Sequence, residues 1–173
     1  MADYFSPTVV QPSIAASEIT PLEHLLLSQI FTAEPDGDAV YFYASEGIND
    51  LPVFPVEDVR AALTASDGIE SHAAAMVRDE IANLGADDAY LQLDISVSGW
   101  EALFQDILRR STTLKYITVV VSWTCTKMRP DGFGGMAILI TPTEIMVRST
   151  DSMIEEMIGI AEYGPTGVER GSG

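Results

Sequence analysis

The sequence predicts an α+β domain with a mixed or antiparallel sheet of about four strands and helices packed on it. Apolar residues recur at helical spacing in several segments, while other segments alternate apolar and polar residues or are rich in β-branched and aromatic side chains. The length of 173 residues and the apolar share of 47% suit one compact domain. We expect an extended N-terminal arm over residues 1–19, a single domain over 20–163 and a C-terminal tail over 164–173.

The N-terminal arm is expected to be extended because it contains two prolines and shows no periodicity. A helix signal begins at the sequence TPLE. Thr20 and Glu23 have the spacing of a capping box, and Pro21 suits the first helical position. A leucine stripe follows, so we expect a helix over 20–32.

The middle of the chain contains both strand and helix patterns. The segment 39–44 (AVYFYA) follows a turn sequence and is aromatic and β-branched, which predicts a strand. Apolar residues at helical spacing predict helices over 55–66 and 71–85. The segment 89–96 (AYLQLDIS) alternates apolar and polar side chains, which predicts a strand with one face in water.

The clearest amphipathic helix is expected over 98–110, where apolar residues recur at i, i+3, i+4, i+7 and i+8. Ser98 and Glu101 are spaced as a capping box at its start. Arg109 and Arg110 lie in the last turn, where cations complement the negative end of a helix. A structural role is enough to explain both arginines.

Two apolar runs, 115–126 and 136–141, predict a β-hairpin. The segment 144–148 (EIMVR) fits either a short strand or a helical turn. A terminal helix is expected over 153–161, ended by Gly164 and the proline that follows. Its Met- and Ile-rich surface is wider than a narrow stripe, so a homo-oligomer formed through this helix is one alternative.

The hairpin loop 127–135 (KMRPDGFGG) holds the densest glycine cluster of the chain. The string GFGGMA matches a dinucleotide-binding fingerprint, but it leads into a strand and not into the helix that the fingerprint requires. A turn followed by a bulge or a positive-φ glycine explains the cluster. Because the loop is long and locally basic, a contact or anion-binding site is the alternative. The candidate contact residues are Lys127, Arg129, Asp131 and Phe133.

Acidic residues are concentrated in the front part of the chain. Residues 1–94 hold 17 of the 26 Asp and Glu and two of the nine Lys and Arg, a net charge of −15, whereas residues 95–173 have a net charge of −2. This excess disfavours direct binding to nucleic acid or to an anionic membrane. A solvated surface that only adds solubility is the commoner origin of such an excess, and a surface for a basic partner protein is the alternative. The candidate acidic surface consists of Asp36, Asp38, Glu57, Asp58, Asp79, Glu80, Asp87 and Asp88.

No motif for catalysis, a cofactor or a metal passes a check of its sequence context. His24, His72 and Cys125 are isolated and lack the paired spacing of zinc ligands. The acidic run that starts at Glu34 lacks the glycine and the bidentate carboxylate of an EF-hand. We therefore expect no cofactor and no metal, and the sequence favours a non-enzymatic protein without deciding the question. The sequence also lacks a signal-peptide pattern and a long apolar run, which favours a cytoplasmic protein.

Two stretches, FSPTVVQP near the start and TKMRPDGFGGMAILIT in the hairpin, resemble a set of uncharacterised bacterial proteins of alphaproteobacterial type that are associated with plasmids or integrated elements. The resemblance covers most of the chain. It implies a bacterial cytosolic setting and an accessory role on mobile DNA, and it brings no activity, cofactor or catalytic residue.

The sequence leaves three functions open. The first is a non-enzymatic protein whose acidic surface binds a basic partner, in one version by imitating the charge of nucleic acid. The second is a small ligand-binding domain or enzyme with its site at the 127–135 loop. The third is an oligomer with a structural role.

Overall fold

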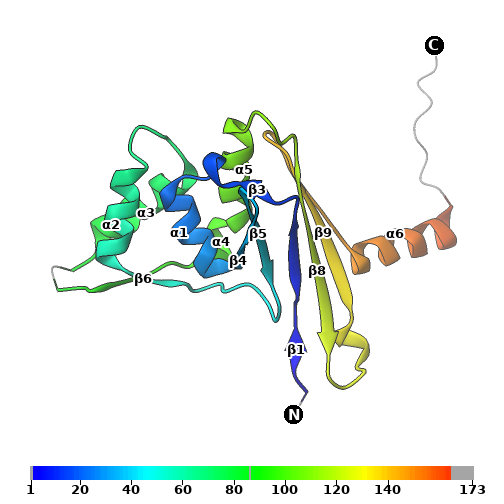
Figure 1. The fold of residues 1–173 in the computed structure, drawn as a ribbon. Coiled ribbons are helices and arrows are strands. Elements are labelled where there is room, and N and C mark those ends of the chain that lie inside the picture. Colours follow the sequence, from blue (N-terminus) through cyan, green and yellow to red (C-terminus); the bar gives the residue numbers. More distant parts are fainter. Residues whose placement is uncertain (1, 86, 165–173) are drawn as a thin grey trace.

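The computed structural model describes residues 2–85 and 87–164 and shows an α+β fold (Figure 1). Its main sheet has eight strands, in the order β10-β9-β8-β2-β5-β3, with β1 paired to β8 and β4 paired to β5. Every pairing in this sheet is antiparallel. The strands are β1 (Tyr4–Phe5), β2 (Thr8–Gln11), β3 (Ile14–Ala15), β4 (Thr32–Asp36), β5 (Ala39–Ala44), β8 (Ile117–Cys125), β9 (Gly134–Ile140) and β10 (Ile145–Ser149).

The antiparallel arrangement agrees with the sequence prediction, but the prediction of about four strands was wrong. Strands β1 to β4 come from short segments without apolar alternation, and such strands depend on pairing with their neighbours. Strand β2 lies between β8 and β5, so part of the expected N-terminal arm is a central strand of the sheet. Residues 165–173 of the expected C-terminal tail lie outside the described residues.

Helices are found at each segment where the sequence predicted a long one. Thr20 Oγ1 accepts the N–H of Glu23, and the Glu23 carboxylate accepts the N–H of Thr20, which confirms the predicted capping box. The helices are α1 (Pro21–Ile30), α2 (Val56–Ala65), α3 (His72–Asn83), α4 (Ile95–Ser98), α5 (Trp100–Arg110) and α6 (Thr150–Tyr163), with the short 3-10 helices η1 (Ala16–Glu18) and η2 (Pro130–Gly132).

The predicted strand over 89–96 is shorter than expected and is not part of the main sheet. Strand β7 (Tyr90–Gln92) pairs with β6 (Val53–Pro55) in a separate two-stranded sheet. The Asp94 carboxylate then accepts the N–H of Ser96 and caps α4, which ends the extended run. Helix α5 starts after Gly99, whose φ is 67°, so the predicted N-cap at residue 98 was wrong.

The C-terminal hairpin is confirmed, since β8 and β9 pair in a regular antiparallel register. The ambiguous segment 144–148 belongs to a strand, because β10 pairs with β9 from Ile145 to Ser149. Ser149 caps α6, and the N–H of Gly164 donates to the Ile160 carbonyl at its end. Helix α6 therefore follows directly from the edge strand of the sheet.

The core lies between the sheet and the helices α1, α3 and α5. The inner sheet residues Val10, Phe42, Val119 and Ile138 are buried against them. Four aromatic rings cluster there with centroids 5.4 to 6.5 Å apart; these are Phe31, Phe42, Trp100 and Phe104. Edge-to-face packing of such rings adds about 0.5–1.5 kcal/mol per pair to the burial of their area.

The two arginines at the end of α5 each form an ion pair, and the two carboxylates of these pairs also connect α5 to α1 and α3. The carboxylate of Glu23 is fully buried and accepts two hydrogen bonds from the Arg110 guanidinium, at 2.6 and 2.7 Å, which ties the start of α1 to the end of α5. Asp106 pairs with Arg109 at 2.9 Å and accepts the N–H of His72 at the start of α3. Both arginines thus have specific partners, in addition to their favourable position at the helix end.

Candidate functional site

Residues 50–94 form an acidic lobe, which contains α2, α3 and the β6–β7 pair and lies at the opposite end of the molecule from α6 (Figure 1). The lobe holds ten Asp and Glu and two Arg, a net charge of −8. Its apolar side chains Phe54, Val59, Val77 and Leu91 are buried in the common core. The lobe therefore shares the core of the domain, which fixes the backbone positions that carry its carboxylates.

Within the lobe, Glu57 and Asp88 come together at a groove of about 460 Å³. The start of α2 lies beside the small sheet because the N–H of Val56 donates to the Ala89 carbonyl at 3.0 Å. Tyr90 lines the same groove and is 66% exposed. Two carboxylates beside an exposed aromatic ring can bind a cationic side chain. The carboxylates form ion pairs with the cation, and the face of the ring attracts it.

Most carboxylates of the lobe are exposed and not used inside the protein. Within residues 2–85 and 87–164, no ion pair is formed by Glu57, Asp58, Asp79, Glu80 or Asp87. Asp88 accepts the N–H of Gly85 at 2.7 Å, and Glu70 lies 3.6 Å from Arg78. Arg60 also lines the groove, so the site contains one cation of its own.

The remaining members of the predicted acidic surface, Asp36 and Asp38, lie outside the lobe, at the β4–β5 hairpin. Asp36 accepts a hydrogen bond from Ser13 Oγ at 2.7 Å. On the same hairpin, the hydroxyl of Tyr43 donates to Glu34 at 2.8 Å, and this hydrogen bond to a carboxylate raises the pKa of Tyr43. The eight predicted acids therefore form two groups on different elements.

Some acidic residues of the front part serve the fold. Glu23 forms the buried ion pair with Arg110 and is not available to a partner. The carboxylate of Glu18 accepts hydrogen bonds from the hydroxyls of Ser111 and Thr113 and from the N–H of Thr112. Fewer acidic side chains of the front part are therefore available to a partner than the count over residues 1–94 suggests.

The loop between β8 and β9 presents its predicted contact residues to solvent, since Lys127, Arg129, Asp131 and Phe133 are all exposed. A small depression of about 290 Å³ lies beside the loop. Asp131 lines it with β1 and β8 residues such as Tyr4 and Trp123, whereas the two cations of the loop do not. The loop residues therefore do not converge on one cavity.

Close contacts explain the glycines of this loop. A Cβ on Gly132 would lie 2.4 Å from the Cβ of Cys125, and one on Gly135 would lie 2.8 Å from the Val121 carbonyl oxygen. Neither glycine has a positive φ, and the β8–β9 register is regular. The bulge or positive φ expected from the sequence was wrong, and the glycines are required by close approach of the chain instead.

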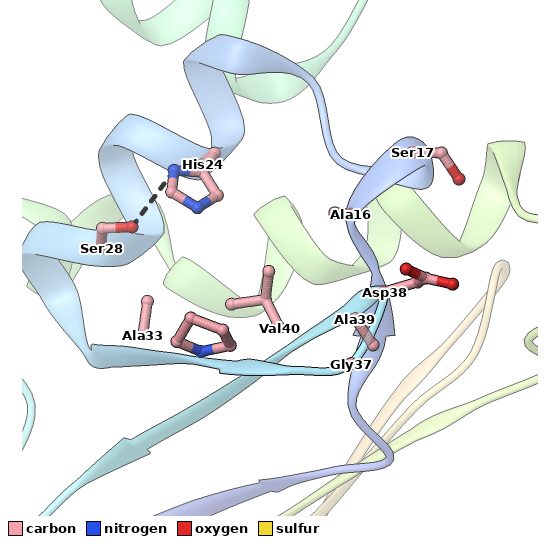
Figure 2. Close-up of a pocket in the computed structure, with 10 residues that line it drawn as sticks. Ala16, Ser17, His24, Ser28, Ala33, Gly37, Asp38, Ala39 and Val40 are labelled. Atoms are coloured by element: carbon pink, nitrogen blue, oxygen red, sulfur yellow. Dashed lines mark hydrogen bonds between the residues drawn. The ribbon is translucent and has the colours of Figure 1, made fainter.

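A cavity of about 870 Å³ lies between α1 and the β4–β5 hairpin (Figure 2). His24 Nδ1 is 3.4 Å from Ser28 Oγ on the same helix. The Asp38 carboxylate and the Ser17 hydroxyl point away from the cavity in Figure 2. A Ser–His pair at this long distance, without a carboxylate directed at the imidazole, does not form a nucleophile and base arrangement.

The described part of the chain contains neither a cluster of metal ligands nor a helix suited to cross a membrane. No group of three or more His, Cys, Asp or Glu side chains there is placed to hold a metal ion. None of the helices in residues 2–85 and 87–164 has the length and hydropathy needed to cross a bilayer.

Sequence reasoning missed two features of these surfaces. The alternation of the sequence correctly directs Leu91 inward, but it does not single out the exposed Tyr90 as a contact residue. The groove joins Glu57 and Asp88, which belong to different elements, so only the tertiary fold brings them together. The one sequence signal that could have pointed to this groove is the density of acids around an aromatic residue.

Comparisons with known proteins found no relative of this chain: no protein-family model, no curated protein sequence and no solved structure matches it.

Proposed function

We propose that this protein is a non-enzymatic binding protein whose acidic lobe engages a basic partner protein. The observation that carries the proposal is the groove where Glu57, Asp88 and the exposed Tyr90 meet on a lobe of net charge −8. The groove accommodates one Lys or Arg side chain, and the surrounding carboxylates attract further cations of the partner. Imitation of nucleic-acid charge is a finer version of this function, in which the partner's cationic surface is itself a nucleic-acid site.

Charge distribution supports the lobe over the other acidic parts of the chain. Helix α2 carries Glu57 and Asp58 in its first turn, where the positive end of the helix favours negative charge. Asp87 and Asp88 follow on the neighbouring loop. Charges fixed on rigid elements steer a partner into one orientation, whereas scattered charges only add solubility.

The proposal is tested by the affinity for a short oligolysine peptide, measured by titration calorimetry at low salt. A lobe variant carries Glu57→Gln, Asp58→Asn, Asp87→Asn and Asp88→Asn. A matched control removes the same number of charges at the other end of the molecule, with Glu144→Gln, Asp151→Asn, Glu155→Gln and Glu162→Gln. Because each exposed pair contributes about 0.2–1 kcal/mol, the lobe variant should bind at least about fivefold more weakly than the control.

Equal weakening in the two variants would show that only net charge matters, and the proposal would then fail. A Tyr90→Ala variant addresses the groove alone. It keeps every charge and should still lose affinity, since the ring contributes a cation–π contact of about 0.5–1 kcal/mol at an exposed site.

A further inference from the structure

The outer face of the main sheet, on the side away from the core, presents apolar side chains in register. Val9 pairs with Val120, Val120 with Ala137, and Leu139 with Met146. Val9, Val120 and Met146 are 37 to 48% exposed. These five residues are called the outer sheet face. No helix of the core layer covers it, because those helices pack on the inner residues.

A groove of about 580 Å³ adjoins this face at one end. Gln11 and Thr118 lie in it, two residues along their strands from Val9 and Val120 and so on the same side of the sheet. Tyr116, which is 54% exposed, also lines the groove, with Lys115 beside it. Pro12 and Leu114 complete the lining, so the groove has a mixed wall of apolar and polar side chains with a cation beside them.

Helix α6 carries a second exposed apolar surface. Its large apolar residues are all 47 to 56% exposed; they are Met153, Ile154, Met157, Ile158 and Ile160. At about 100° per residue they share one side of the helix, and the four acids of α6 occupy the other side. Figure 1 shows α6 extending away from the body, on the side of the sheet opposite α1 to α3.

The helix is held to the rest of the protein mainly near its start. Thr150 Oγ1 accepts the N–H of Gly135 at 3.1 Å, and Glu156 pairs with Arg148 at 2.6 Å. A 14-residue helix is marginal in water without packing of its apolar side. The five apolar side chains are still about half exposed, so most of this stabilising packing is missing. A second surface that buries the apolar side of α6 is therefore needed.

Charge identifies the covering surface. Helix α6 has four acids and no cation, a net charge of −4. Segment 115–149, which forms the outer sheet face except Val9, has four cations and two acids, a net charge of +2 in a chain of −17. One of these cations, Arg148, already pairs with Glu156 of its own copy, and the other three are Lys115, Lys127 and Arg129. An anionic membrane would repel the helix. The sheet surface formed by this segment has a charge opposite to that of α6, so an α6 of another copy can extend toward it.

We propose that two copies of this chain form a dimer in which α6 of each copy lies on the outer sheet face of the other. The apolar side of α6 covers Val9, Val120 and Leu139, and its side chains enter the groove beside Lys115. The two contacts are related by a two-fold axis, since each copy supplies both the helix and the sheet. This dimer is independent of the acidic lobe, which stays free at the far end of each copy.

Sedimentation velocity over a range of protein concentrations tests the dimer. The native chain should sediment as twice its mass of 18.7 kDa. A helix variant, Ile154→Asp with Ile158→Asp, and a sheet variant, Val120→Asp, should each dimerise at least about tenfold more weakly. Leu51→Asp adds the same single charge as the sheet variant, at an apolar residue that is also 50% exposed but lies in the acidic lobe, so it should not change the dimer.

The substituted positions are about half exposed, so the variants should fold, and circular dichroism checks this. If a variant does not fold, the milder Ile154→Ala with Ile158→Ala replaces it and should also weaken the dimer. A native chain that stays at 18.7 kDa at its highest soluble concentration, or variants that dimerise as the native chain does, would overturn the proposal.

A mixture of the helix variant and the sheet variant tests the geometry of the dimer. In the mixed pair, the intact helix of the sheet variant meets the intact sheet of the helix variant, so one of the two contacts is restored. The mixture should associate where each variant alone does not. If it stays monomeric, the helix does not dock on the sheet of the other copy.

Discussion

Glu23 shows how a charged residue can belong to the core. Its carboxylate has no solvent exposure, yet it is fully satisfied by Arg110 and by the N–H of Thr20. Removing one partner of a buried pair leaves the other charge without compensation, which costs more than the pair itself contributes.

We therefore expect Glu23→Gln to lower the free energy of unfolding by about 3 kcal/mol, measured by urea denaturation. The matched control is Glu156→Gln, which breaks the pair with Arg148. Both of those side chains are more than half exposed, so the control should cost less than about 1 kcal/mol. Equal losses in the two variants would mean that the buried pair has no special role.

The glycines of the hairpin give a second prediction. Gly135→Ala places a Cβ 2.8 Å from the backbone oxygen of Val121, which cannot move aside without disturbing the sheet. It should destabilise the protein by about 1–3 kcal/mol. Gly159→Ala, in the interior of α6 with no atom within 4 Å of the added Cβ, should instead stabilise it by about 0.5–1 kcal/mol.

Thermal or urea unfolding of both glycine variants measures the difference. An unchanged stability for Gly135→Ala would show that the strands can separate slightly at this point. Close packing would then not explain the glycine, and the anion contact proposed from the sequence would be the alternative explanation.

Elements with strong local signals could be predicted from the sequence, and elements that depend on their neighbours could not. Helix α1 has a capping box and a leucine stripe, and the apolar runs of β8 and β9 specify strands on their own. Strands β1 and β3 have two residues each, and β4 (TAEPD) has a turn-like composition. Pairing with β8 and β5 is what makes them strands, and a sequence does not display pairing.

Helix α6 is the element whose stability depends most on association. In a dilute, monomeric sample its backbone amides should exchange with solvent far faster than those of α5, because few of its side chains pack against the protein. At concentrations where the dimer forms, the amides of α6 should become protected while those of α5 stay unchanged. Hydrogen exchange read by mass spectrometry at both concentrations checks this, and an α6 that is equally protected in both would contradict it.

At the scale of the whole molecule, the structure has two distinct ends. The acidic lobe with α2 and α3 lies at one end, and α6 with its exposed apolar side lies at the other (Figure 1). The sequence already showed that acids gather in the front part of the chain. It could not show that Glu18 and Glu23 are used within the fold, or that Glu57 and Asp88 meet at one groove, because these contacts join residues distant in sequence.

The most direct test of the acidic lobe as the binding surface is a titration of the isotope-labelled protein with a short oligolysine peptide, followed by backbone NMR shifts. The account predicts that the largest shifts gather around Glu57, Asp88 and Tyr90 and saturate together. Shifts spread evenly over all exposed acids, or centred on the loop from Lys127 to Phe133, would contradict it.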